Sequence, residues 1–175
     1  MTELLVLCTG NAARSVMAGF MLETLEAARR GTDLHIVTGG THTVDGQPMG
    51  LRTRSALKAL PELADVDFRR HRSRQVGMAD LSRADLVVVM EADHVRFVRR
   101  HYPEAAVRTA TIRRLCEDLP PGPPSLAERV AALALADATL SEVDDVIDPA
   151  GGEAAEYDAC VAELWKLCGR LITRL

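Results

Sequence analysis

The N-terminal part of the chain changes its hydrophobic period abruptly, and this change constrains the fold more than any other feature. Residues 4–7 form a short apolar run that ends before Gly10 and Asn11, as expected for a strand buried on both faces of a sheet. From Val16 to Leu25 the apolar residues recur at helical spacing until the polar residues 29–31. The sequence therefore predicts a strand, a tight loop and a helix in immediate succession.

The rest of the chain alternates between strand-like and helix-like patterns. Further strands are expected at residues 35–37, 86–90 and 107–111, with a short strand or extended segment at 64–68. Helices are expected at residues 51–60, from a cap at Asp93 to His101, at 126–140 and at 153–175. Such alternation favours an α/β fold, in three α/β/α layers around a mostly parallel four-stranded sheet, with right-handed crossovers. The length of 175 residues fits a single domain, residues 1–175.

The composition limits the kinds of binding partner and the cellular location that we expect for the protein. The net charge of -4 gives no general attraction to nucleic acid or to an anionic membrane, and no apolar run approaches the roughly 20 residues that span a bilayer. We therefore expect a cytoplasmic protein with no nucleic-acid or membrane partner. The four cysteines lack C-x-x-C spacing, so neither a zinc site nor a redox pair is indicated.

Cys8 and Arg14 lie six residues apart at the junction between the first strand and the first helix. The spacing alone is not specific, because Cys168 and Arg174 repeat it inside the C-terminal helical pattern. Cys8 differs because a loop before a helix N-terminus presents successive backbone N–H groups and the helix dipole to a dianion. We therefore expect residues 8–15 to form a phosphate-binding loop and interpret Cys168 as structural.

The side chains of this loop suit a cysteine nucleophile. Gly10 permits close backbone approach, Asn11 tolerates positive φ, and Arg14 offers a planar fork to two phosphate oxygens. The donors that bind phosphate also stabilise a thiolate at Cys8. The alternative is a small buried cysteine that only packs at the end of a strand. The expected phosphate-binding residues are Thr9, Gly10, Asn11, Ala12, Ala13 and Ser15.

These residues resemble the phosphate loop of the low-molecular-weight protein tyrosine phosphatase family, C-x-G-N-x-C-R-S-P. The similarity continues along nearly the whole chain: residues 38–41 stand where the family has S-A-G-T, residues 71–74 match H-x-A-R, and Asp148 with Pro149 matches a late aspartate-proline pair. Residues 148–152 are similar to the D-P-F-G-G of bacterial members, and Gly151-Gly152 is shared with the protein arginine phosphatase branch. A proline-rich stretch at about 118–125, followed by an extra helix, stands out as an apparent insertion and is expected to be an exposed loop.

The resemblance implies a two-step reaction that needs no metal or other cofactor. Cys8 attacks phosphorus, Arg14 binds the phosphoryl oxygens, and Asp148 protonates the leaving oxygen and later activates water. Ser15 supports the leaving sulfur. The expected bracing residues are Asn11, Thr38 and His71. The partners would be a phosphorylated protein or a small phosphomonoester, with inorganic phosphate as product, and the protein would be a monomer or a weak dimer.

Several positions depart from the family pattern and leave the substrate open. Ala13 replaces a second loop cysteine, so an oxidised Cys8 has no neighbouring thiol to trap it. Residues 42–45 and 150–151 carry none of the aromatic residues that family members acting on phosphotyrosine tend to place there, and Ala12 replaces the threonine of the phosphoarginine enzymes.

Four functions therefore remain in view. A protein-tyrosine-phosphatase-like enzyme is the main hypothesis. The alternatives are a phosphatase of a small metabolite, such as a sugar or nucleotide phosphate in a biosynthetic pathway, a protein arginine phosphatase, and an inactive phosphate-binding module. Arsenate reduction is disfavoured because Cys160 and Cys168 belong to a helix stripe, and a serine hydrolase because the chain has no G-x-S-x-G.

Overall fold

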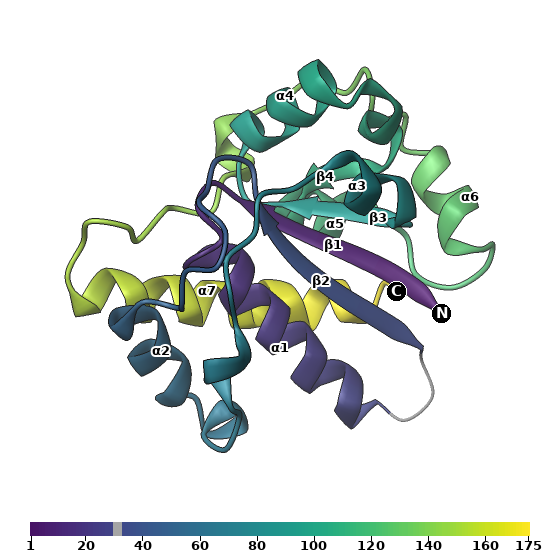
Figure 1. The fold of residues 1–175 in the computed structure, drawn as a ribbon. Helices are drawn as coiled ribbons and strands as arrows, with labels where there is room; N and C mark the ends of the chain where they lie inside the picture. Colours follow the sequence, from purple (N-terminus) through teal and green to yellow (C-terminus); the bar gives the residue numbers. More distant parts are fainter. Residues whose placement is uncertain (30–32) are drawn as a thin grey trace.

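The computed structural model describes residues 1–29 and 33–175, and within these ranges it contains one sheet of four strands. The strands are β1 (Thr2–Cys8), β2 (Leu34–Gly40), β3 (Leu86–Val89) and β4 (Thr109–Thr111). They lie in the order β2-β1-β3-β4, and every neighbouring pair is parallel. Helices cover both faces of the sheet (Figure 1), so the predicted three-layer α/β fold is confirmed.

Alternate residues of β1 face the two helical layers. Leu4 and Val6 pack with α1 (Arg14–Ala28), α5 (Ile112–Asp118) and α7 (Ala154–Ile172). Leu5 and Leu7 pack instead with α3 (Met78–Arg83) and α4 (Ala92–His101). Because both faces of β1 are buried, the strand is apolar without alternation, as the sequence pattern indicated. The remaining helices, α2 (Leu51–Lys58) and α6 (Leu126–Ala131), lie at the periphery (Figure 1).

The parallel arrangement brings the carboxyl ends of the strands to one edge of the sheet. Cys8 at the end of β1 pairs with Gly40 at the end of β2, and Leu7 pairs with Val89 at the end of β3. At Gly40 a Cβ atom would lie 2.7 Å from the carbonyl oxygen of Thr9. Only glycine therefore lets β2 end this close to the loop after Cys8.

Three sequence predictions are wrong in this fold. Residues 64–68 form no strand: they connect two 3-10 turns, and the Asp67 carboxylate caps the second by accepting the Arg69 N–H at 3.0 Å. The helix expected at 126–140 ends at Ala131, and Ala134 adopts φ of 48°, which a right-handed helix cannot contain; beyond it, Arg99 donates to the carbonyl oxygens of residues 135 and 138 at 2.7 Å. Glu91, not Asp93, occupies the N-cap position of α4.

Other differences concern the ends of elements and two short helices. Strand β2 extends past the expected end at residue 37 as far as Gly40, within the 38–41 motif, whereas β4 begins at Thr109 and β3 ends before Met90. Helices α3 and α5 were not expected. Arg30 and Gly31, at the expected end of the first helix, lie outside the described residues.

The proline-rich segment is an irregular, exposed loop between α5 and α6. Arg129, a buried residue of α6, anchors both ends of this loop by donating to the carbonyl oxygens of Pro120 at 2.6 Å and Pro124 at 3.0 Å. In the described part of the chain, no helix is long and apolar enough to cross a membrane.

Candidate active site

Cys8 lies at the carboxyl end of β1, where the chain leaves the sheet and enters the loop that leads to α1. Its side chain is 3% exposed, and its Sγ lies 2.9 Å from the Oγ of Ser15 in the first turn of α1. The two ends of the predicted phosphate loop, residues 8–15, are therefore in direct contact through a thiol and a hydroxyl group.

Asn11 organises the middle of the loop. It adopts φ of 48°, is fully buried, and donates from Nδ2 to Ser15 Oγ at 3.1 Å and to Thr38 Oγ1 at 3.0 Å. The backbone oxygen of Asn11 accepts a hydrogen bond from His71 Nε2 at 2.9 Å, and its Oδ1 accepts from the Arg74 N–H. Thr38 and His71, both expected to brace the loop, thus contact it at this one residue.

The carbonyl oxygens of the loop accept hydrogen bonds from residues outside the loop. The oxygens of Thr9, Gly10 and Ala12 accept hydrogen bonds of 2.9, 2.8 and 3.1 Å. The donors are the His42 N–H and the hydroxyl groups of Thr43 and Thr53. Within residues 1–29 and 33–175, no hydrogen bond uses the amide N–H groups of residues 10–13. These four consecutive N–H groups are free in the described part of the chain, while the carbonyl oxygens of the loop accept hydrogen bonds from other segments. This is the donor set that an anion-binding loop requires.

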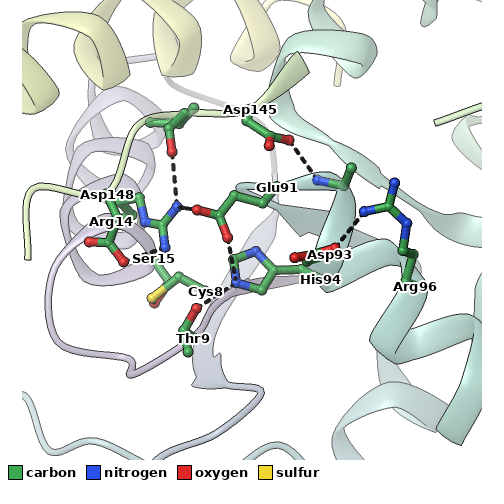
Figure 2. Close-up of polar contacts among 12 residues, drawn as sticks. Cys8, Thr9, Arg14, Ser15, Glu91, Asp93, His94, Arg96, Asp145 and Asp148 are labelled. Atoms are coloured by element: carbon green, nitrogen blue, oxygen red, sulfur yellow. Dashed lines mark hydrogen bonds and ion pairs between the residues drawn. The ribbon is translucent and has the colours of Figure 1, made fainter. Parts of the chain in front are cut away.

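Arg14 is buried to 1% exposure and connects the loop to two distant segments (Figure 2). Its Nη1 donates to the Glu91 carboxylate and to the Val146 carbonyl oxygen at 2.9 Å, and its Nη2 donates to Asp148 Oδ2 at 2.6 Å. Among the described residues, nothing accepts a hydrogen bond from its Nε. The predicted nucleophile, arginine and acid therefore lie in one site, although Asp148 is 134 positions from Arg14 in the sequence.

Two residues of the site were not expected from the sequence, Glu91 and His94. His94 is 3% exposed, and its Nε2 lies 2.9 Å from Thr9 Oγ1 and 3.6 Å from Glu91 Oε2. Burial, reinforced by the neighbouring Arg14 guanidinium, lowers the pKa of His94 to about 4, so the ring is neutral at pH 7. A signal for Glu91 was present, because it follows a buried strand at the sheet edge that carries Cys8.

His71 is also neutral at pH 7. Burial lowers its pKa, with Arg72 and Arg70 acting in the same direction, while the hydrogen bond to the Asn11 backbone opposes the shift. A neutral ring that binds a carbonyl oxygen through Nε2 carries its proton there. His71 therefore serves as a fixed donor to the loop.

The other cysteines are buried thiols, and of these Cys160 lies near enough to Arg14, Asp148 and Cys8 for their charges to act on it. Burial raises the pKa of the Cys160 thiol to about 12 and also raises the pKa values of Cys168 and Cys116. Cys168 is fully buried in α7, where its thiol contacts the Ala18 carbonyl oxygen, and so the cysteine-arginine spacing near the C-terminus is structural. Within the described ranges, no group of three or more His, Cys, Asp or Glu side chains could hold a metal ion.

Comparisons with known proteins agree with this geometry. Residues 3–120 match the family model described as low molecular weight phosphotyrosine protein phosphatase. A protein-arginine-phosphatase of Geobacillus stearothermophilus is 25% identical over 174 residues, which cover 99% of this chain and 95% of the relative. Among solved structures, a low molecular weight protein tyrosine phosphatase from T. tengcongensis is 27% identical with a TM-score of 0.78, covering 100% of both chains. The YwlE arginine phosphatase from Geobacillus stearothermophilus, at 24% identity, has a TM-score of 0.75 and covers 98% of this chain and 91% of its own.

Proposed function

The chain belongs to the low molecular weight phosphotyrosine protein phosphatase family and is a cysteine-dependent phosphatase, and we propose that Cys8 attacks the phosphorus of phosphorylated proteins. The observation that carries this assignment is the contact between Cys8 Sγ and Ser15 Oγ inside a loop whose amides 10–13 are free donors. A thiolate at that position is stabilised by the same groups that bind the phosphoryl oxygens.

In the first step, the phosphate dianion occupies the loop and accepts hydrogen bonds from its amides and from Arg14. The Nε of Arg14 is without a partner in the described structure, and Nη2 lies on the same edge of the guanidinium group. Phosphoryl oxygens bind this edge as a fork and replace Asp148 on Nη2. Cys8 Sγ forms a bond to phosphorus while the bond to the leaving oxygen breaks, and Asp148 donates its proton to that oxygen.

In the second step, water attacks the phosphocysteine. Asp148 removes a proton from the water, the new oxygen-phosphorus bond forms, and the sulfur-phosphorus bond breaks to release inorganic phosphate. The Ser15 hydroxyl donates to the departing sulfur from 2.9 Å. Asn11 holds that hydroxyl group in place through Nδ2.

For the substrate we propose a phosphorylated protein side chain, with phosphotyrosine first and phosphoarginine second. The second candidate has its own support, because a protein-arginine-phosphatase covers almost the whole chain at 25% identity and residues 42–45 and 150–151 contain no aromatic residue to stack on a tyrosine ring. A phosphate ester of a small metabolite is the third candidate, because the lack of aromatic residues at 42–45 and 150–151 gives no preference for an aryl phosphate over a small ester.

Turnover of matched substrates separates these candidates. One peptide sequence is prepared with phosphotyrosine or with phosphoarginine, and kcat/KM is compared with that for hexose phosphates and nucleoside monophosphates, with Cys8→Ser as the control. The proposal expects a phosphopeptide to exceed every metabolite by at least about 100-fold in kcat/KM, a difference of roughly 3 kcal/mol in transition-state binding. A metabolite that surpasses both peptides would refute the assignment to protein substrates.

A further inference from the structure

One carboxylate of the site, Glu91, has no part in the two steps above. It follows β3 at the N-cap position of α4, and its side chain is 25% exposed. One of its oxygens accepts a hydrogen bond from Arg14 Nη1, and the other lies 3.6 Å from His94 Nε2 (Figure 2). A negative charge beside a site for a dianion weakens anion binding by repulsion, so its presence there calls for a physical reason.

The contacts of Arg14 supply the first part of that reason. Glu91 and the Val146 carbonyl oxygen both bind Nη1, which lies on the edge of the guanidinium away from Nε. The opposite edge consists of Nε, which has no partner in the described residues, and of Nη2, which binds the exposed Asp148. Glu91 thus fixes the guanidinium by the edge that the phosphate does not need.

His94 supplies the second part. Its neutral ring carries one N–H, and Nε2 is the nitrogen that lies near Glu91 and Thr9. The nearby carboxylate favours the proton on Nε2, while Nδ1 is buried and has no partner among the described residues. With that tautomer the ring donates to Thr9 Oγ1, the residue directly after Cys8.

We propose that Glu91 is a positioning residue that ties together the two ends of the phosphate loop, Arg14 directly and Thr9 through His94, and keeps the Nε–Nη2 edge of Arg14 turned toward the phosphate. This inference rests on the proposed function, since it concerns the same site. It adds a residue to that function which acts through Arg14 and never touches the substrate.

A double-mutant cycle with an activated aryl phosphate tests the inference. Glu91→Ala is expected to lower kcat by about 100-fold, as misplacement of a catalytic group does. In an Arg14→Lys background the same change is expected to cost less than about 3-fold, because there is no guanidinium left to orient. Asp93→Ala is the matched control: Asp93 lies two residues on and pairs with Arg96 outside the site (Figure 2), so kcat is expected to stay within about 2-fold.

A second variant separates charge from orientation. Glu91→Gln keeps an acceptor oxygen for Arg14 Nη1 but loses the negative charge, so inorganic phosphate is expected to inhibit it at least as tightly as wild type while kcat falls by about 10-fold. Equal losses from Glu91→Ala in the wild-type and Arg14→Lys backgrounds, or an unchanged kcat, would overturn the inference. Those results would leave the proposed function standing, because that function is tested separately, by the turnover of Cys8→Ser and by the comparison of substrates.

Discussion

Acidification tests whether His94 is neutral in the folded protein. Burial and Arg14 lower the pKa of this residue from 6.5 to about 4, with Asp148 and Asp93 opposing. The His94 side chain therefore becomes protonated near pH 6.5 in the unfolded chain but only near pH 4 in the folded protein. Stability that is complete above pH 6.5 is lost as the pH falls from there toward 4.

The size of the loss follows from the width of that window. A difference of about 2.5 pKa units, at roughly 1.4 kcal/mol per unit, corresponds to about 3.5 kcal/mol in the free energy of unfolding, of which about 3 kcal/mol is lost by pH 4. His71 acts in the same direction, because burial lowers its pKa as well. Carboxylates with lowered pKa values, such as Asp67, lose their contribution only at lower pH, since the starting value is 3.8.

Urea unfolding of wild type and His94→Gln at pH 7, 6, 5 and 4 isolates the effect, because the glutamine amide can still bind Thr9 but does not titrate. Wild type is expected to lose about 3 kcal/mol more than the variant over this range. His101→Gln, an exposed position on the same helix, is the control and should follow wild type. Parallel loss in wild type and His94→Gln would refute the neutral His94 and with it the assignment of its single proton to the Nε2 that binds Thr9.

Three further predictions concern the loop and the acid. Asp148→Asn should lower kcat/KM, which reports the first step, by at least about 100-fold for alkyl phosphates but by less than about 10-fold for activated aryl phosphates, because only the former need a protonated leaving group; equal losses would argue against an acid. Gly10→Ala should leave the urea midpoint unchanged, since a Cβ there meets no atom within 4 Å, yet lower kcat/KM by about 10-fold or more, because glycine is what permits phosphate to approach the loop backbone closely. Asn11→Ala should lower the free energy of unfolding by about 3 kcal/mol, because three side-chain hydrogen bonds are lost and alanine is strained at φ of 48°. Asn11→Gly should cost less, because glycine adopts this φ without strain. The reverse order would contradict this account of the loop.

The strand, loop and helix around Cys8 were predictable because their signals are contiguous in the sequence. Residues 4–7 are apolar on both faces and the helical spacing begins directly after the loop. The helix expected at 126–140 failed for the opposite reason. Its alanine and leucine content favours a helix, but the backbone leaves the helical region at Ala134, with φ of 48°, and Arg99, 36 positions earlier than Leu135, holds the Leu135 carbonyl oxygen.

The site was predictable only as far as local pattern and resemblance reached. Asp148 came from its similarity to a family motif, since nothing local distinguishes it from a turn aspartate before proline. Glu91 and His94 carry no motif, and their roles depend on contacts across 77 and 85 sequence positions. The topology could have pointed to Glu91, because parallel strands end at a common edge.

Identification of the phosphorylated residue tests the central claim most directly. Asp148→Asn is mixed with an activated aryl phosphate, quenched with acid during turnover, digested and analysed by mass spectrometry, so that slow hydrolysis of the intermediate lets it accumulate. The mechanism predicts a phosphoryl group on the sulfur of Cys8 and none in a parallel reaction of Cys8→Ala. A phosphoryl group on any other residue, or full turnover by Cys8→Ala, would contradict it.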